Sequence, residues 1–541
     1  MTRIKLLLIL VLVTLISPTI LAQQADNYPP DDVNVTMTST NLPIVWIQVD
    51  SAMILKDERI TARMKIIHNG DGELNYPDTV AHPGQHIDYE GYIALRYRGN
   101  SSFSMSDKKP YSFKTINKPL ENGGSKVRVD ILGMGKDNNW ALLAPYSDRS
   151  MMRDVLAFEI AKPWMEYTPE GRYCEMFLDG TYYGVYILTE VVSKGKNRLN
   201  LDDPGETGDE LTGGYLLEVD RHEGNCFTSK YPPVDNNGNR CGNYEVYIQH
   251  KIPDDDDITE AQIEYSRNRV YEMEDALASD DFCDPENGYR KYLDEMSFID
   301  YQLVTELSRN VDGYRLSGKF FKRRDSQDER FKMVVWDMNL AFGNCYKYNT
   351  WRTSGWIYQS NGTMYSGGED IFIPFWWYRL NKDPEYTANL KKRWAQYRIN
   401  NVRSDRIMAT VDSIATLLTS HGAVERNSQA WPRWDVHLWP NYYVSRSYEA
   451  ELQYIKNWIN NRITWMDGEL GFDPNAQSIR GDVDCDLKVS ITDVAALIDY
   501  LLSGNEAGID MTAADCDLNG SVSISDVTIL IDFLLTDSWG D

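Results

Sequence analysis

The sequence predicts an α+β protein that ends in a small all-α tail. After residue 42, short runs of β-branched and aromatic residues alternate with turn residues, which is typical of strands. Between residues 407 and 466 apolar residues recur at helical spacing instead. Residues 481–541 contain a duplicated pattern of an acidic loop followed by a short amphipathic helix. We therefore expect a mixed β-sheet, a set of C-terminal helices and a separate helical module.

The first residues have the order of a secretory signal peptide. Arg3 and Lys5 precede the apolar run Leu6–Ile16, and the small residue Ala22 follows it. This run is too short to span a bilayer comfortably. Residues 1–22 are therefore predicted to be a signal peptide, and the mature protein is predicted to be secreted without a membrane span.

Charge and cysteine content narrow the classes of partner. The net charge of −26 disfavours nucleic acid and anionic membranes. Residues 481–541 hold thirteen acids against Lys488 alone, so much of this charge is local. Seven cysteines in an exported chain permit disulfides, and the candidate pairs are Cys226 with Cys241 and Cys485 with Cys516.

The β-rich start, residues 42–95, leads into a loop of small polar residues. Strands are expected at Leu42–Val49 and Ile60–Ile67, and the loop is Arg98–Ser102. Such a loop allows backbone N–H groups to approach phosphates, while a lysine on the returning strand neutralises charge. Lys114 is the preferred phosphate contact and Lys108 or Lys109 the alternates. A plain turn beside solvated lysines is the competing interpretation.

A helix and further strands follow in the middle of the chain. Ser150–Ala161 is expected to be helical, and its Glu159 is either a partner of the phosphate lysine or a solvent-facing glutamate. Cys174–Glu190 is predicted to form a hairpin that turns at Asp179-Gly180, and Gly213–Asp220 adds a strand.

Two aspartates stand at the ends of secondary-structure elements. A helix over Met296–Arg309 should stop near Asp312-Gly313. Strands at Lys319–Phe321 and Phe331–Trp336 are joined by an exposed charged turn, and Asp337 follows the second strand. Two such carboxylates suit a metal-assisted transfer in which one orients a hydroxyl and the other holds Mg²⁺. Structural caps of two turns are the alternative.

The later part of the main domain is expected to be supporting structure. The aromatic run Phe375–Tyr378 is interpreted as core rather than as a wall that faces substrate. Helices over Ile407–Leu418 and Leu452–Met466 should pack against the catalytic part. Residues 471–480 are a short linker.

The order of these motifs resembles the CotH family of atypical secretory protein kinases. The set comprises Arg98-Gly99-Asn100-Ser101-Ser102 with Lys108–Tyr111, Leu142–Asp148 with Met152-Arg153, the Asp179-Gly180 hairpin ending at Glu190, Gly213–Asp220, Asp312 and Trp336-Asp337. The resemblance covers residues 42–470. It implies a distant protein-kinase-like fold that binds ATP with Mg²⁺ or Mn²⁺ and phosphorylates protein Ser/Thr hydroxyls.

The resemblance also assigns roles to individual positions. Asp312 matches the catalytic aspartate and Asp337 the metal-binding aspartate, with Asn339 beside it. Two positions depart from the family pattern, because Ser317 stands where an asparagine is expected and Asn339 where many members have a second aspartate. The residues expected to contact the nucleotide are Arg98, Asn100, Ser101, Lys114, Glu159 and Glu190.

The C-terminal repeat has the spacing of calcium-binding loops. Asp493–Leu502 repeats as Asp526–Leu535 at an offset of 33 residues. Oxygen donors at loop positions 1, 3, 5 and 12 suit Ca²⁺; they are Asp482, Asp484, Asp486 and Asp493 in the first loop and Asp515, Asp517, Asn519 and Asp526 in the second. The second loop has Gly520 at the turn where the first has Leu487, so it is expected to bind more tightly.

The pair of loops, residues 481–541, resembles a type I dockerin, which folds around two Ca²⁺ ions and docks onto a cohesin module. An acidic helical hairpin without metal is the alternative. The combined hypothesis is an exported kinase that acts on a protein substrate and is tethered through its dockerin to a cohesin-bearing scaffold, either free or at the cell surface. Two other classes stay open, a catalytically inactive CotH-like binding protein and a carbohydrate-active enzyme.

Overall fold

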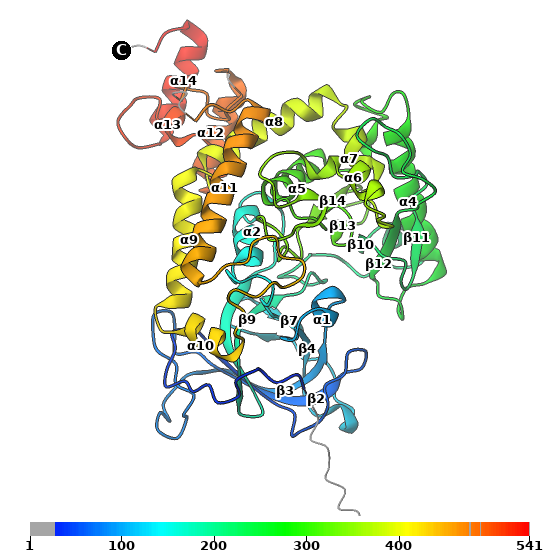
Figure 1. Cartoon of the computed structure of the whole chain (residues 1–541). Helices are drawn as coiled ribbons and strands as arrows, with labels where there is room; N and C mark the ends of the chain where they lie inside the picture. The colour runs from blue at the N-terminus through cyan, green and yellow to red at the C-terminus, as the bar shows by residue number, and fades with distance from the viewer. Residues whose placement is uncertain (1–26, 475–477, 487, 540–541) are drawn as a thin grey trace, which may run out of the picture.

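The computed structural model describes residues 27–474, 478–486 and 488–539. The predicted signal peptide and Leu487 lie outside the described residues. A β-barrel forms one end of the main domain (residues 42–470), a unit of helices around a second sheet forms the other, and the C-terminal tail lies beside the helices far from the barrel (Figure 1).

The first strands close into a barrel. Its order is β1-β2-β3-β4-β7-β9-β8, and all neighbours are antiparallel except β1 and β8, which run parallel. A closed barrel leaves no edge strand unpaired. The strands are β1 (Ile44–Gln48), β2 (Ile60–Ile67), β3 (Ile87–Tyr97), β4 (Tyr111–Ile116), β7 (Asn139–Leu143), β8 (Gly171–Leu178) and β9 (Thr181–Glu190).

A second, antiparallel sheet lies in the helical unit of the main domain. Its order is β11-β12-β10-β13-β14, so the single mixed sheet expected from the sequence is two separate sheets. The strands are β10 (Tyr215–Asp220), β11 (Cys226–Thr228), β12 (Tyr247–Ile252), β13 (Gly318–Lys322) and β14 (Phe331–Val334), and a small ribbon, β5 (Val129–Asp130) with β6 (Lys136–Asp137), stands apart.

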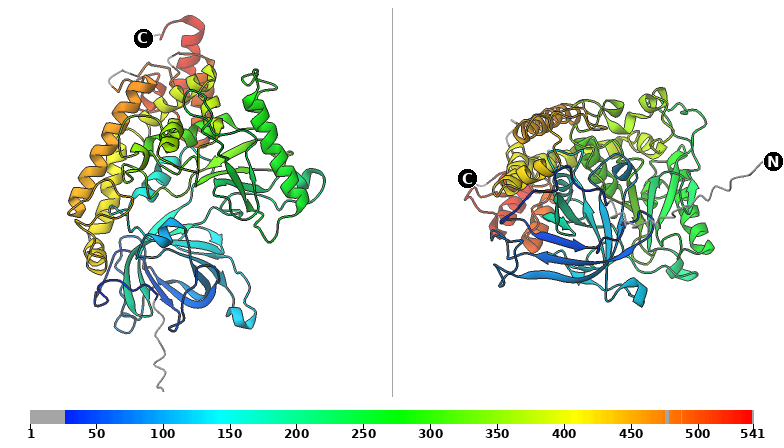
Figure 2. Two further views of the ribbon diagram at one scale, coloured as in Figure 1. Left: turned by 45° about the vertical axis from the view of Figure 1, so that its right-hand side comes forward. Right: turned by 60° about the horizontal axis from the view of Figure 1, so that its bottom comes forward.

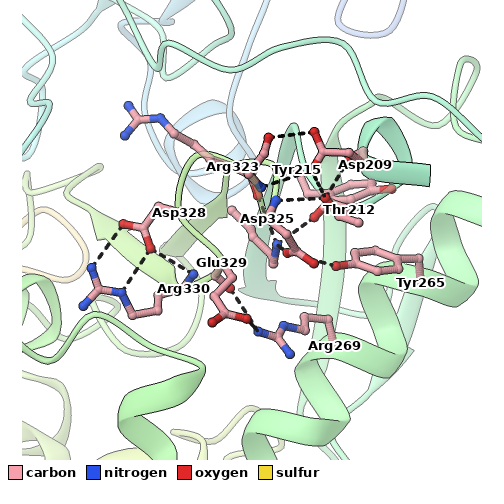
Figure 3. A network of polar contacts seen from close by, with 12 residues as sticks. Asp209, Thr212, Tyr215, Tyr265, Arg269, Arg323, Asp325, Asp328, Glu329 and Arg330 are labelled. Carbon is pink, nitrogen blue, oxygen red and sulfur yellow. Dashed lines mark hydrogen bonds and ion pairs between the residues drawn. The ribbon is translucent and has the colours of Figure 1, made fainter. Parts of the chain in front are cut away.

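The charged connection between β13 and β14 is held in place by polar contacts (Figure 3). Asp325 accepts from the Lys322 ammonium over 2.5 Å, and Arg269 on α4 forms an ion pair of 3.1 Å with Glu329. The first contact lies within the hairpin and the second ties the connection to α4, so the turn of the hairpin that precedes Asp337 is fixed.

Helices surround the second sheet, and α9 and α11 run side by side (Figure 2). The helices of the main domain are α1 (Ser101–Ser104), α2 (Arg153–Ala161), α3 (Gly208–Leu211), α4 (Glu260–Ala278), α5 (Glu295–Ser308), α6 (Asn361–Ser366), α7 (Phe375–Leu380), α8 (Pro384–Ile399), α9 (Ser404–Thr419), α10 (Ala423–Ala430) and α11 (Tyr448–Leu470). Trp376 and Trp377 are each 1% exposed, which confirms the aromatic run as core.

Two helix ends differ from the expectation. α5 stops at Ser308 because Arg309 adopts a left-handed conformation at φ 48°, so the exit does not depend on Gly313. α2 begins at Arg153, since the carboxylate of Asp148 accepts from the backbone N–H groups of Ser150 and Arg153 and holds the preceding turn.

On α11, buried Arg462 donates to the carbonyl of Glu306 on α5 over 2.9 Å.

The tail has a small core of its own. It consists of α12 (Ile491–Ser503), α13 (Met511–Ala514) and α14 (Ile524–Thr536), with Leu497 and Leu530 buried between the two long helices. Among the described residues, no helix combines the length and apolar character needed to cross a membrane.

The cysteine pairs expected from the sequence were wrong, because all seven cysteines are free. Cys241 is packed into the large core of the main domain, whereas Cys226 pairs with Gln249 on β12. Cys516 is buried in the tail core and donates to the carbonyl of Ala513. These thiols fill packing positions.

Candidate functional site

A cavity of about 1000 Å³ lies between the barrel and the second sheet. The barrel side contributes the end of β3, the loop to α1, β4 and β7, while the other side contributes β10, β12, β13 and the segments that hold Asp312 and Asp337. Of the positions predicted for the nucleotide and its metal, Arg98, Asn100, Ser101, Lys114, Asp312, Asp337 and Asn339 all line this cavity.

Asp337 lines the cavity three residues beyond the end of β14, and it is exposed to solvent there. Its backbone has φ 58°, a left-handed conformation that aspartate tolerates better than most residues. Asn339 donates to one carboxylate oxygen over 2.6 Å, and the hydroxyl of Ser317 lies 3.4 Å from the other. The protein around the cavity desolvates this carboxylate although solvent reaches it, and together with the charge of Asp312 this raises the pKa of Asp337. The carboxylate would therefore gain from a cation beside it.

A second acid, Asp154, lines the cavity beside Asp337 and was missed by the sequence reasoning. It projects from the first turn of α2 and accepts from the backbone N–H of Met338 over 2.6 Å. Burial and the neighbouring Asp337 raise the pKa of Asp154 to about 8. The signal in the sequence is a charged pair, Arg153-Asp154, at the start of a helix whose other charged residue is Glu159.

Arg153 connects this turn to two distant parts of the chain. Its guanidinium forms ion pairs with Asp148 and, over 2.9 Å, with Glu451 on α11. It also donates to the carbonyl of Ala341 over 3.0 Å. All three side chains are buried, so the backbone that follows Asp337 is fixed from α2 and α11 together.

Asp312 lines the same side of the cavity as Asp337, on the loop after α5. Its side chain is 21% exposed and forms an ion pair of 3.1 Å with Arg315, which is itself 3% exposed. The same guanidinium contacts Glu369 over 3.1 Å and the carbonyl of Ile371 over 2.9 Å. Arg315 therefore fixes Asp312 against the segment 369–371, which forms another part of the wall.

A buried ionic cluster on the second sheet completes this side. Glu218 on β10 binds Lys319 over 2.5 Å and Lys251 over 3.2 Å. Burial opposes the charge of Glu218, but the two lysines outweigh it and hold its pKa below the ordinary value. Asp220 lines the wall nearby, and burial followed by the charge of Glu218 raises its pKa to about 6.

The barrel wall is predominantly basic. Burial, then the charges of Lys126 and Arg59, lower the pKa of Lys114 to about 8, and within the described part of the chain no carboxylate forms an ion pair with it. Arg98 stacks 5.0 Å from the ring of Trp336, and its Nη1 is buried without a hydrogen-bond partner among the described residues. Arg98 feels the charges of Asp337, Asp154 and Glu218, so it lies between the acidic groups of the cavity and the basic barrel wall.

Gly99 allows the loop beside Arg98 to turn. Its φ is 82°, and a Cβ there would lie 2.0 Å from the hydroxyl of Ser102. The left-handed backbone therefore favours glycine at this position, and a larger residue would also have to displace the Ser102 hydroxyl. The loop carries Asn100 and Ser101 to the mouth of the cavity.

Four other candidates lie elsewhere. Glu159 is exposed on α2 and does not line the cavity. Glu190 is buried in an ion pair with Arg198, outside the lining. Lys108 donates to the carbonyl of Val185 and to Asn427, and Lys109 donates to the carbonyls of Phe103 and Ser106. The structure thus separates Lys114 from its two alternates.

The acidic loops of the tail gather their carboxylates. One oxygen each from Asp482, Asp484 and Asp486 lie within 4.8 Å of one another, and so do those of Asp515, Asp517 and Asp526. At position 12, Asp493 and Asp526 are fully buried, and each accepts two backbone N–H bonds within its own loop. Asn519 accepts from Ser521 at the edge of the second loop. Oxygen-only donors at this spacing fit Ca²⁺.

Sequence comparison identifies two families in this chain. Residues 95–466 match the family described as CotH kinase protein, and residues 480–535 match the type I dockerin domain. A search of curated proteins found no similar sequence. The first match begins inside β3, so β1 and β2 complete the barrel from outside the matched residues. The chain therefore belongs to the CotH kinase protein family and carries a C-terminal type I dockerin domain.

Proposed function

We propose that this protein is an exported kinase that transfers the γ-phosphate of ATP to Ser or Thr hydroxyls of a protein substrate. One observation carries the proposal: Asp312 and Asp337 line the same cavity as Arg98 and Lys114, which come from the barrel side. Phosphoryl transfer needs an anchored polyphosphate and an acceptor hydroxyl in line with it, and this arrangement suits both.

Each group has a proposed task. Arg98 and Lys114 bind phosphate oxygens, with Asn100 and Ser101 at the mouth of the site. Asp337 would hold Mg²⁺ or Mn²⁺, which neutralises phosphate charge when bound, and the neighbouring oxygens of Asp154 and Ser317 suit a hard cation. Asp312 orients the acceptor hydroxyl and accepts its proton, and Arg315 keeps that carboxylate in place.

A catalytically inactive binding protein is the second candidate, and one contact favours it. Both oxygens of Asp337 already have a neighbour, since Asn339 lies 2.6 Å from one and Ser317 lies 3.4 Å from the other. These are the two positions that depart from the family pattern. A site in which amide and hydroxyl groups hold Asp337 would bind nucleotide poorly or without turnover.

Transfer of labelled γ-phosphate from ATP to the protein itself or to a generic protein substrate, with Mg²⁺ or Mn²⁺, separates the two candidates. Asp312→Asn and Asp337→Ala should each abolish transfer while the circular dichroism spectrum stays that of the wild type. Wild-type protein that binds ATP without transferring phosphate would favour the inactive form. Full activity in either variant would remove the proposed roles.

For the tail, we propose that two Ca²⁺ ions order a module that docks on a cohesin-bearing scaffold outside the cell. Its surface supports this, because apolar side chains that a soluble module would bury are exposed in matching pairs. Ile491 and Ile524 are 70% and 71% exposed, and Leu502 and Leu535 are 82% and 77% exposed. Exposed apolar patches of this kind mark protein–protein contacts.

Calcium titration of the full chain, followed by binding to an immobilised cohesin in calcium and in chelator, tests this part. Binding should appear only with calcium. Equal capture in chelator would remove the calcium role, and no capture by any cohesin in calcium would remove the proposed partner.

A further inference from the structure

The first acidic loop of the dockerin is in contact with the main domain, residues 42–470, hereafter the catalytic domain. Lys392 on α8 places its Nζ 2.9 Å from Oδ2 of Asp484 and 3.9 Å from a carboxylate oxygen of Asp486. One turn along the same helix, Gln396 donates to the backbone carbonyl of Asp484 over 3.0 Å. Helix α8 thus presents one charge and one neutral donor to the same loop residue.

Apolar packing supports the contact. Ala507, in the segment between α12 and α13, packs against the large core of the catalytic domain. Lys392 is 33% exposed and Asp484 is 13% exposed, so the ion pair is largely shielded from water. An ion pair at such a site is screened less by salt than one on the open surface.

The two carboxylate oxygens of Asp484 have different surroundings. Oδ2 faces Lys392, whereas Oδ1 is buried and has no hydrogen-bond partner among the described residues. A carboxylate oxygen of Asp484 also belongs to the group shared with Asp482 and Asp486. A cation held by this loop and the ammonium of Lys392 would therefore both act on the carboxylate of Asp484.

The second loop differs in this respect. Within the described part of the chain, no lysine or arginine forms an ion pair with Asp515, Asp517 or Asp526, whereas Lys392 approaches two donors of the first loop. Two cations close to one carboxylate repel each other, so the presence of one reduces the binding free energy that the other obtains from that carboxylate. The catalytic domain thus places its charge on one loop only.

We propose that Lys392 lowers the calcium affinity of the first dockerin loop, so that calcium binding there and docking of the dockerin on α8 oppose each other. By linkage, the factor by which Lys392 weakens calcium binding is the factor by which calcium weakens the contact. The proposal rests on the calcium-binding role of the tail and is independent of phosphoryl transfer. Calcium in the first loop then loosens the dockerin from its own catalytic domain.

Isothermal titration of the calcium-stripped full chain with CaCl₂ tests this. Lys392→Ala should tighten the first loop by about two- to fivefold, the range expected for a partly shielded charge pair, and should leave the second loop unchanged. Lys391→Ala is the matched control, because Lys391 is the exposed neighbour on the same helix. Lys392→Arg keeps the charge and should behave as the wild type. Repeating the titration in Asp517→Asn, which weakens the second loop, assigns the affected site.

Salt and shape provide independent readouts. High salt should narrow the difference between wild type and Lys392→Ala, because the effect is electrostatic. Small-angle scattering in saturating calcium should give a larger radius of gyration for Lys392→Ala/Gln396→Ala than for Lys391→Ala, at equal helicity. Unchanged or weaker calcium binding in Lys392→Ala would overturn the proposal, as would an equal effect of Lys391→Ala. If neither loop of the wild type binds calcium, the proposed role of the tail fails first.

Discussion

Asn339 donates from Nδ2 to Oδ1 of Asp337 over 2.6 Å, so an amide occupies the position beside the candidate metal-binding carboxylate. In Asn339→Asp this hydrogen bond is replaced by a second negative charge. The two carboxylates would repel each other unless a divalent cation lies between them.

We therefore expect Asn339→Asp to bind Mn²⁺ at least several-fold more tightly than the wild type, at the cost of lower stability in chelator. Titration followed by electron paramagnetic resonance measures the first effect and thermal unfolding the second. Asn339→Ala removes the amide without adding charge and serves as the control. Equal Mn²⁺ affinity in all three proteins would place the metal elsewhere.

Arg315 is expected to act as a positioning residue for Asp312. Arg315→Ala frees the aspartate from the segment 369–371 and should lower kcat on the order of ten- to a hundredfold, with little change in KM for ATP. Arg315→Lys keeps the charge but cannot bridge two carboxylates, so its kcat should lie between those of the wild type and Arg315→Ala. Arg323→Ala, which breaks an ion pair with Glu166 outside the cavity, is the control. A rise in KM alone would instead assign Arg315 to nucleotide binding.

Lys108 predicts a pH dependence of stability. Burial lowers its pKa to about 7, against about 10.4 for an unfolded lysine. The contribution of buried Lys108 to the free energy of unfolding is fully present above the pKa of the unfolded state. It is lost as the pH falls toward the lower pKa of the folded state. The free energy of unfolding of the wild type should therefore decline between pH 10 and pH 7.

Lys108→Met should flatten that part of the profile, because it removes the titrating group. The variant also leaves the carbonyl of Val185 without its donor, which costs about 1–3 kcal/mol. Urea unfolding at several pH values measures both effects, with exposed Lys391→Met as the control. ATP affinity should stay unchanged, and a loss of affinity would return Lys108 to the phosphate site.

The exposed apolar pairs of the dockerin predict a redundant binding face. Ile491 and Leu502 lie on α12, and Ile524 and Leu535 occupy the corresponding positions of α14. If either helix can present its pair to a cohesin, Ile491→Asp/Leu502→Asp alone should reduce affinity only a few-fold, and all four changes should abolish binding. Surface plasmon resonance measures this. Complete loss from one pair would show that a single helix makes the contact.

Local elements were predictable where short-range chemistry determines them. The hairpin of β8 and β9 turns at Asp179-Gly180, where both residues have positive φ, 46° and 86°. The strands on either side of the charged turn before Asp337 also pair as expected. The parallel pairing of β1 with β8 joins residues more than a hundred positions apart, and no local pattern carries it. The division of the strands into a barrel and a second sheet therefore had to come from the structure.

The candidate site was likewise predictable only where local sequence patterns determine the positions of its residues. Asp312 and Asp337 flank strongly patterned elements, which made their positions at element ends visible. On α2 the residue predicted for the site is Glu159, whereas the acid that lines the cavity is Asp154. Five residues along an α-helix turn the side chain by about 140°, so the two acids point to different sides and only Asp154 faces the cavity. Choosing between them required knowing which side of α2 is buried.

Helix α11 gives the tether a mechanical aspect. It leads toward the dockerin, and along its length Glu451 binds Arg153 while Arg462 binds the carbonyl of Glu306. Through Arg153 it also reaches the carbonyl of Ala341, just beyond Asp337. If a scaffold binds the tail as proposed and pulls on it, the force would enter the main domain as shear along these buried contacts. The segment after Asp337 and the tail would then resist the same force.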